Sequence, residues 1–468
     1  MPTVRTLHLL PNAHLDPVWL WDWREGLNEG LVTIRTVLDL MDEFPELTFL
    51  RGEVSIYEHV ERTDPATFAR LRRQVEAGRW DVVGGTYVQP DSNLPAAETL
   101  CRQFERGLAY FESRFGRRPT VAWQADSFGH TPGWPDILRA FGMEDFAFTR
   151  PGRGQFPMAA PAFRWLTGSG DDGVLCYRPH WPAYCNERAN LPEVLDATWR
   201  DAAAHPFENV GVLFGLGNHG GGPTRRHVEE VRAWAAAHPE AGVRFSTLHG
   251  FFAALRAELA RSPAADAAVE AVRGDLGYCL RGCYSSVAKF KFPYRRTEAL
   301  LSAAETAQAV VAAALGVAPL PLDEAWDAVL FNSFHDVLPG SSIERAFDDQ
   351  LAWIGGAAHR ALVARTGALN ALASQADTRV PPPEAPDRPR DVSLLVCNGL
   401  PRPFKGWFEL EANMDYRPVA GAPFTVGSLP LFFEGADGSR PLFQEVMVEH
   451  RANQGAAWRK RVAVCDEL

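Results

Sequence analysis

The sequence lacks the features of an exported or membrane-anchored chain. Its first residues, MPTVRTLHLLPNAH, contain too short an apolar run for a signal peptide and no cleavage pattern. No stretch of about 18 consecutive apolar residues follows, which is the length that a membrane-spanning helix needs. We therefore expect a cytoplasmic protein that does not bind a membrane.

The chain also lacks a dense, even set of cysteines and any long basic run. Its 7 cysteines are an odd number spread over 468 residues, which is unlike a small disulfide-rich domain and favours a reducing compartment. Cys279 and Cys283 have no second pair or suitably spaced histidine beside them, so we interpret both as structural. The formal net charge of -11 does not favour a nucleic-acid partner. Assembly into a homo-oligomer is left open.

The length of the chain predicts a multidomain protein, because single cores rarely exceed about 250 to 300 residues. Short β-type runs alternate with longer helical patterns from residue 4 to about 250, which predicts a parallel α/β sheet or barrel. Ala-rich and Leu-rich helical patterns follow. We expect an α/β domain that carries the site at 1–258, a helical middle domain at 259–378, a Pro-rich linker at 379–391 and a partial β-sandwich domain at 392–468. The last of these contains the strand-like runs VSLLVCNGL, GWFELE and RKRVAV.

Polar residues stand where apolar strands of the predicted sheet end. His14 and Asp16 are two residues apart after TLHLLPNA, so their side chains can point the same way. Asp126 follows VAWQA, and Gly129 permits a tight turn behind it. His335 interrupts an apolar helical segment just before a Pro-Gly break. Together the two imidazoles and two carboxylates form a ligand set suited to one zinc ion. The pair of His14 and Asp16 alone would be only a weak signal, since His14 is then more often an ordinary loop histidine.

Four ordered stretches, HLDPVW, ADSFGHTPGWPDIL, GCYSSVAKFK and FNSFHDVLPGSS, together resemble the α-mannosidases of glycoside hydrolase family 38. GRWDVVGGTYVQPDSNLP and GNHGGGPT are also similar, so the resemblance extends from residue 5 to about 350. It implies a zinc-dependent retaining glycosidase that acts on an oligosaccharide or mannoside substrate. The metal ligands would be the residues that match His14, Asp16, Asp126 and His335.

The resemblance also implies roles around the metal. Asp126 would be the nucleophile, and Trp19 would lie against the sugar ring, while the neighbouring tryptophans Trp21 and Trp23 are expected to pack in the core. Retaining hydrolysis needs a second group that protonates the leaving oxygen.

Three more residues are candidate contacts of the same pocket. We expect Phe128 to line it, and Asp336 to bind a substrate hydroxyl or to orient a ligand. Arg150 would pair with the nucleophile or with substrate, although a solvated surface arginine is an equal alternative.

The sequence departs from the family pattern at the proton donor. Many relatives carry an aspartate where this chain has Asn218, and asparagine cannot exchange a proton near neutral pH. Four alternatives remain for the proton donor. His219 or a carboxylate from elsewhere takes the role, or the acid lies at another position in a subgroup that keeps asparagine here, or catalysis is impaired. Relatives also continue for several hundred residues, so a partial β domain with unpaired strand edges and exposed apolar surface is expected here.

Two rival functions follow from these observations. Asn218 and the missing C-terminal region favour a catalytically silent or fragmentary mannoside-binding relative. Histidine and aspartate ligands at strand ends would also serve a metal-dependent carbohydrate deacetylase, in which a metal-bound water replaces Asp126 as the nucleophile.

Overall fold

A computed structural model describes residues 5–168, 170–179, 191–217, 219–277, 279–383, 390–415, 432–435, 437–450 and 457–467. The chain divides into two compact units. Unit 1 comprises Met1–Ala299 and Leu322–Ala358, and unit 2 comprises Leu300–Pro321 and His359–Leu468. The domain boundaries expected from the sequence stay a prediction.

Unit 1 contains the strands that the alternating pattern predicts. A parallel three-stranded sheet has the order β8-β1-β9, and a five-stranded sheet has the order β10-β6-β7-β5-β4, in which only the β6–β7 pair is antiparallel. A parallel β2–β3 pair completes the set. The strands are β1 (Thr6–Pro11), β2 (Phe49–Arg51), β3 (Trp80–Val82), β4 (Val121–Gln124), β5 (Asp145–Phe148), β6 (Ala162–Leu166), β7 (Gly173–Tyr177), β8 (Asn209–Phe214), β9 (Gly242–Phe245) and β10 (Glu270–Val272).

Contacts between these sheets give unit 1 a barrel-like arrangement. A parallel bridge between Asn12 and Leu50 joins the end of β1 to β2. On the other side, the hydroxyl of Tyr177 in β7 lies 3.1 Å from the carbonyl oxygen and 2.9 Å from the amide nitrogen of Gly211 in β8. The predicted α/β class with a largely parallel sheet is therefore confirmed.

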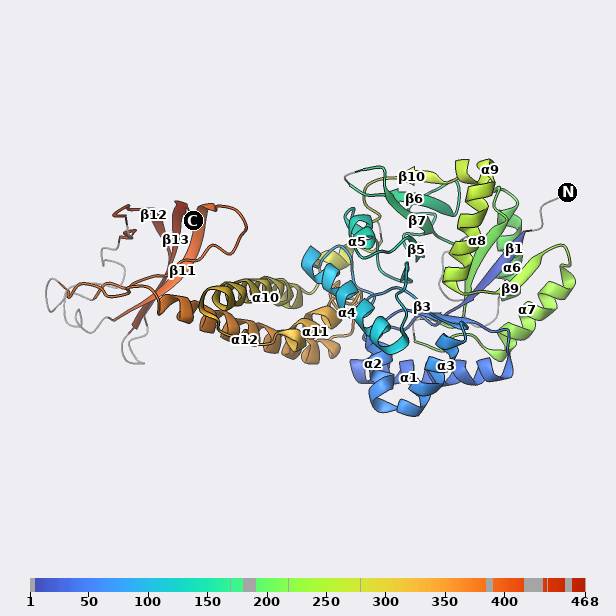
Figure 1. The fold of residues 1–468 in the computed structure, drawn as a ribbon, viewed down its shortest axis with the longest axis horizontal. Coiled ribbons are helices and arrows are strands. Elements are labelled where there is room, and N and C mark those ends of the chain that lie inside the picture. The colour runs from blue at the N-terminus through green and yellow to red at the C-terminus, as the bar shows by residue number, and fades with distance from the viewer. Residues whose placement is uncertain are drawn as a thin grey trace. The chain divides into compact units, whose positions relative to one another are not determined.

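Amphipathic helices cover the strands of unit 1. Helix α1, for example, begins after Asp22, whose carboxylate accepts the Arg24 amide at 2.9 Å, a common N-terminal cap. Figure 1 shows α1, α2 and α3 side by side at one side of the sheets. The helices that precede the middle region are α1 (Trp23–Glu43), α2 (Val54–Thr63), α3 (Pro65–Glu76), α4 (Ala97–Phe115), α5 (Trp134–Ala140), α6 (Leu191–Ala202), α7 (Arg225–Ala237), α8 (Leu248–Arg261) and α9 (Pro263–Ala267).

One apolar cluster connects the three-stranded sheet to the five-stranded sheet, because it joins residues of β1, β4, β5, β7, β8 and α8. Its members include Leu10, Trp123, Leu213 and Phe251, all 5% exposed or less. Burying each such side chain contributes roughly 1.5–3 kcal/mol. The strand ends that carry the polar residues are thus held on a rigid core.

Helices α10 (Ala288–Leu315), α11 (Asp323–Asn332) and α12 (Ala346–Ala373) form the predicted helical region, and a short 3-10 helix, Arg281–Ser285, precedes them. The division between the units falls within α10 and within α12. By length and composition α10 could cross a membrane, with a mean hydropathy of 1.2 in its most apolar window, but helices packed inside soluble proteins pass the same test.

Unit 2 contains an antiparallel sheet of the order β11-β13-β12, formed by β11 (Lys405–Asp415), β12 (Leu442–His450) and β13 (Ala457–Glu467). The expected strands in GWFELE and RKRVAV are present. The prediction of a strand in VSLLVCNGL, residues 392–400, is wrong: this segment is irregular, and its apolar side chains are mostly exposed rather than paired in the sheet. Residues 384–389 of the expected linker lie outside the described residues.

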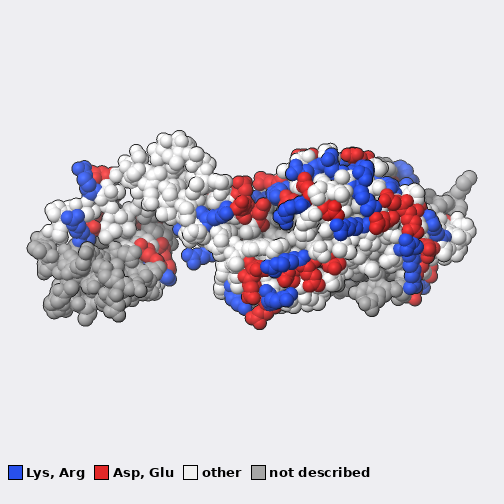
Figure 2. Space-filling model, turned by 90° about the horizontal axis from the view of Figure 1, so that it is seen from below, with Lys and Arg blue, Asp and Glu red and all other residues white. Residues whose placement is uncertain are grey.

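Charged side chains of both signs are interspersed on the face of unit 1 that Figure 2 shows. Unit 1 contains many exposed pairs of opposite charge, such as Arg225 with Glu43 and Arg232 with Glu46. Exposed pairs of this kind contribute little to stability, about 0–1 kcal/mol each.

Candidate metal centre and surrounding site

His14, Asp16, Asp126 and His335 form one buried cluster. Each offers a ligand atom, and these atoms all lie within 4.8 Å of one another. Nε2 of His14 is 2.8 Å from Oδ1 of Asp16, and Nε2 of His335 is 3.4 Å from the same oxygen and 3.9 Å from Oδ2 of Asp126. The structure therefore brings together the four residues that the sequence analysis selected.

The fold explains why these residues meet. His14 and Asp16 follow β1, and Asp126 follows β4, so all three stand where parallel strands end, the usual place of sites in α/β folds. His335 lies in the turn after α11. Glycine is required behind Asp126, since Gly129 has a φ of 126° and a Cβ there would lie 2.5 Å from a carbonyl oxygen.

The hydrogen bonding of His335 points its second nitrogen into the cluster. Its Nδ1 is 2.8 Å from the carbonyl oxygen of Gln89, which can only accept, so Nδ1 carries the hydrogen. Nε2 is buried and lies 3.4 Å from Oδ1 of Asp16. A buried nitrogen facing two carboxylates is the arrangement that a metal ligand requires.

The electrostatics of the cluster favour a cation. Burial opposes ionisation of Asp16, but His14 and His335 nevertheless hold its pKa at about 2. Burial would also lower the pKa of His335, yet its hydrogen bond to Asp16 and the charges of Asp336, Asp16 and Asp126 raise that pKa to about 9. Two imidazoles and two carboxylates gathered in this way fit a divalent first-row metal ion.

Arg150 and Phe128 adjoin Asp126. Nε of Arg150, a half-buried side chain, lies 2.5 Å from Oδ1 of Asp126. The Phe128 ring is 5.8 Å from the His335 ring, and the Arg150 guanidinium carbon is 5.7 Å from the Phe128 centroid. Of the two alternatives for Arg150, the structure places it against Asp126 rather than at the solvated surface.

Asp336 lies beside the cluster and is buried. Its Oδ1 accepts a hydrogen bond from the Ser341 hydroxyl. Burial, reinforced by the negative charge of Asp16, raises the pKa of Asp336 to about 7.

The three tryptophans after Asp16 lie in different surroundings. Trp21 is 6% exposed, and its indole nitrogen donates to the Asp16 carbonyl oxygen at 2.8 Å. Trp23 donates to Asp349 at 3.0 Å. Trp19 is partly exposed, with its ring centroid 5.7 Å from that of Trp21. Trp21 therefore both packs and supports the loop that contains Asp16.

The Gly-rich loop after β8 lies beside the loop that contains His14. Leu15 and His219 form an antiparallel bridge, and the His219 ring stacks on Trp21 at a centroid distance of 4.0 Å. Nε2 of His219 is 3.7 Å from Oε1 of Glu25, a residue that the sequence analysis missed. Asn218 lies outside the described residues.

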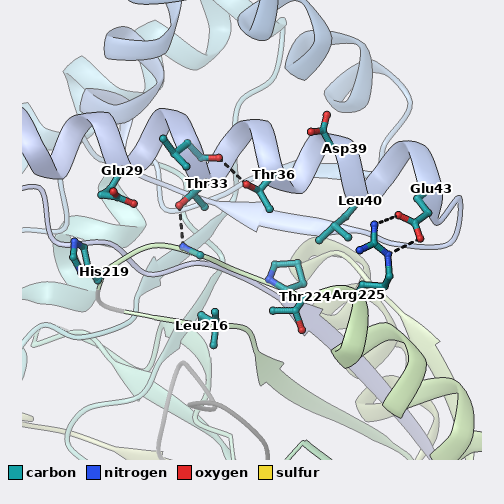
Figure 3. A pocket seen from close by; sticks show the side chains of 13 residues that line it. Glu29, Thr33, Thr36, Asp39, Leu40, Glu43, Leu216, His219, Thr224 and Arg225 are labelled. Atoms are coloured by element: carbon teal, nitrogen blue, oxygen red, sulfur yellow. Dashed lines mark hydrogen bonds and ion pairs between the residues drawn. The ribbon is translucent and has the colours of Figure 1, made fainter.

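A cavity of about 510 Å³ lies next to this loop, between α1 and the segment that leads into α7 (Figure 3). His219 lies at its edge with Glu29 and Thr33 of α1, and none of the four cluster residues lines it. Thr33 accepts a hydrogen bond of 2.9 Å from the Gly221 amide, which fastens the Gly-rich loop to α1. The cavity is thus adjacent to the candidate proton donor rather than to the metal cluster.

Two family comparisons cover most of the chain. Residues 4–272 match the Glycosyl hydrolases family 38 N-terminal domain, and residues 279–370 match the Alpha mannosidase middle domain. The sequence is 28% identical over 345 residues to Alpha-mannosidase G of Dictyostelium discoideum, covering 73% of this chain and 31% of that protein. It is 27% identical over 353 residues to Alpha-mannosidase 2C1 of Mus musculus, covering 74% and 33%. The chain thus spans about a third of the length of these curated relatives.

The fold is similar to that of an alpha-mannosidase from Enterococcus faecalis V583, with a TM-score of 0.71 and 17% identity. That match covers 99% of this chain and 54% of the other. A second Enterococcus faecalis protein, of glycosyl hydrolase family 38, gives a TM-score of 0.65 at 16% identity over 100% of this chain and 53% of the other. At these identities the structures support the fold alone.

Proposed function

Because the chain belongs to glycoside hydrolase family 38, we propose that it carries the catalytic machinery of a zinc-dependent retaining α-mannosidase that hydrolyses terminal α-mannosidic bonds of oligosaccharides. The observation that carries this proposal is the buried cluster of His14, Asp16, Asp126 and His335, in which Asp126 also contacts Arg150. The four side chains would hold one zinc ion per chain.

Asp126 is the nucleophile in this proposal. Its carboxylate attacks the anomeric carbon, the glycosidic bond breaks, and a covalent glycosyl-aspartate forms that water then hydrolyses with net retention. Arg150 holds Oδ1 of Asp126 in one orientation, which reduces the freedom that the carboxylate would lose on reaction.

The sugar would lie between Asp126 and the aromatic side chains. Trp19, which is partly exposed, offers a face for the apolar side of a pyranose, and Phe128 borders the cluster. Asp336 is in reach of the cluster to accept a hydrogen bond from a sugar hydroxyl. Bound zinc would supply Lewis-acid contacts to the 2- and 3-hydroxyls and so favour the distorted, oxocarbenium-like ring.

His219 takes the proton-donor role in this proposal, because the neighbouring Asn218 has no exchangeable proton at neutral pH. An imidazole can both donate and accept a proton, as a group with this role must. Glu25, 3.7 Å from Nε2 of His219, and the stacked Trp21 ring hold the imidazole in place.

The test is release of nitrophenol from a nitrophenyl α-mannoside by the purified chain, with added zinc and with a chelator. An activated leaving group needs little protonation, so the assay examines the metal cluster without depending on His219. We expect turnover that zinc restores after chelation and that Asp126→Ala abolishes. Stoichiometric metal binding without turnover would instead favour the silent, mannoside-binding alternative that Asn218 motivates.

We further propose that the protein is cytoplasmic and trims free oligosaccharides rather than secreted glycoproteins. The sparse, odd set of 7 cysteines supports this, because it favours a reducing compartment. Recovery of the native protein outside the cell would overturn it.

A further inference from the structure

Gln89, in the loop after β3, connects two parts of the metal cluster. Its backbone carbonyl accepts hydrogen bonds from Nδ1 of His335 at 2.8 Å and from the His335 amide at 3.3 Å. Its side-chain carbonyl accepts the Ala125 amide at 2.9 Å, directly before Asp126 in the chain. One fully buried residue, 1% exposed, thus holds both the His335 ring and the backbone that carries Asp126.

The same side chain leads to a third part of the cluster. The Gln89 amide donates to Oε1 of Glu53, whose other oxygen lies 3.5 Å from Nη2 of Arg51. Nη1 of Arg51 donates to the carbonyl oxygen of Ala13 at 2.7 Å, directly before His14 in the chain. Arg51 and Glu53 are 2% and 3% exposed.

This arrangement is a costly way to stabilise a fold. Removing an arginine and a glutamate from water costs several kcal/mol per ion, and well-packed apolar side chains often replace such a pair without loss of stability. The network of Arg51, Glu53 and Gln89 instead reaches the chain at Ala13, at Ala125 and at His335 itself. Its contacts therefore end at one cluster residue, His335, and directly before two others, His14 and Asp126.

We propose that Arg51, Glu53 and Gln89 are positioning residues that hold His14, Asp126 and His335 in the geometry a metal ion requires. They do not contact the ion or the sugar; they act through the backbone at Ala13 and Ala125 and through the ring of His335. The inference rests on the metal site of the proposed function, and metal affinity is the property that it predicts.

The first test compares Gln89→Met with Gln308→Met, both measured on the purified full chain. Gln308 is a matched control because it is also buried, 7% exposed, and its side chain also makes two hydrogen bonds, to the amide nitrogen of Leu320 at 2.5 Å and to its carbonyl oxygen at 3.2 Å. Zinc affinity is measured by competition with a chromophoric chelator, cobalt coordination by visible absorption, and stability by thermal unfolding of the metal-free protein.

We expect Gln89→Met to weaken zinc binding by about 10- to 100-fold and to change the cobalt spectrum, as losses of outer contacts to metal ligands do. Gln308→Met should bind zinc as the unsubstituted chain does, even where its thermal stability falls by as much. Equal affinity in Gln89→Met and the unsubstituted chain, or equal weakening in both variants, would overturn the inference alone. Failure of the unsubstituted chain to bind an ion would overturn the proposed metal site as well.

A second variant decides the matter where Gln89→Met does not fold. In Arg51→Met/Glu53→Gln the buried charges are removed together, and the new amide can still accept from Gln89. The Arg51–Glu53 contact and the tie to Ala13 are lost, while the contacts of Gln89 remain. Because a buried ion pair can be replaced at little cost, we expect near-normal thermal stability with zinc affinity lowered about 10-fold. Unchanged zinc affinity in this folded variant would show that the network does not position the cluster.

Discussion

Replacing Arg150 with methionine separates catalysis from metal binding. Nε of Arg150 lies 2.5 Å from Oδ1 of Asp126, whose side chain is 9% exposed, so the two groups form an ion pair that is shielded from water on the side of Asp126. Contacts of this kind contribute about 1.5–3 kcal/mol. At about 1.4 kcal/mol per factor of ten, loss of that energy in the transition state lowers kcat by about 10- to 150-fold.

Metal affinity should respond in the opposite direction. Arg150→Met removes a positive charge from beside the cluster, so the carboxylate of Asp126 is left to bind a cation at least as tightly as before. Arg150→Lys is the control, since it keeps the charge but not the fixed guanidinium geometry. The assay is steady-state release of nitrophenol together with zinc competition. Unchanged kcat in Arg150→Met, or a fall in zinc affinity that matches the fall in kcat, would refute this reasoning.

Three further predictions follow from other residues. His219→Gln should slow hydrolysis of an unactivated mannobiose by about 10²- to 10⁴-fold but that of a nitrophenyl mannoside by less than about 10-fold; equal losses on both substrates would remove His219 from the proton-donor role. Burial of Asp145, only partly offset by the partner Arg256, raises the pKa of this carboxyl from 3.8 to about 6. Between these two pH values the folded state keeps a proton that the unfolded state has lost. The contribution of Asp145 to the free energy of unfolding is therefore complete below pH 4 and falls by about 3 kcal/mol as the pH rises through 6. Urea unfolding at pH 4 and pH 7 should therefore show a smaller fall for Asp145→Asn than for the unsubstituted chain, and parallel pH dependence would contradict the assignment. Gly129→Ala should lower the melting temperature, because φ is 126° and the added Cβ would lie 2.5 Å from a carbonyl oxygen, at a cost of about 1–3 kcal/mol. Gly133→Ala is the control that should change little, since a Cβ there meets no atom within 4 Å. Equal melting temperatures for the two variants would show that the turn tolerates a side chain.

The grouping of the metal cluster was predictable because it depends on chain position. His14, Asp16 and Asp126 follow apolar strands, and the carboxyl ends of parallel strands meet at one edge of a sheet. His335 was found by a different route, since a polar pair inside an apolar helical segment needs a partner in the folded protein. Local sequence pattern and one general rule of α/β folds are therefore enough to group the four residues.

The positioning network was not predictable in the same way. Arg51 and Glu53 belong to one segment and Gln89 to another, and nothing near them in sequence indicates that they meet or that they are buried. In the sequence LTFLRGEV, Arg51 and Glu53 would be predicted to be solvated charges at a strand end. Only the packed structure shows that their hydrogen bonds reach Ala13 and Ala125.

Two other outcomes show where local pattern is insufficient. Residues 392–400 have strand-like composition, yet they form no strand, because β-type side chains specify a strand only where a partner strand pairs with them. The contact between Glu25 and His219 joins the first turn of α1 to the loop after β8, and no spacing in the sequence relates these positions. Both the absence of a strand at 392–400 and the contact between Glu25 and His219 depend on tertiary contacts that the local sequence does not show.

The most direct test of the central claim is to trap the glycosyl-enzyme. The zinc-loaded chain is incubated with a fluorinated, activated mannosyl donor that forms the covalent intermediate faster than it is hydrolysed, and the digested protein is analysed by mass spectrometry. We expect one glycosyl group on the peptide that contains Asp126, and none in Asp126→Asn. A glycosyl group on a different carboxylate, or turnover with inversion at the anomeric carbon, would contradict it.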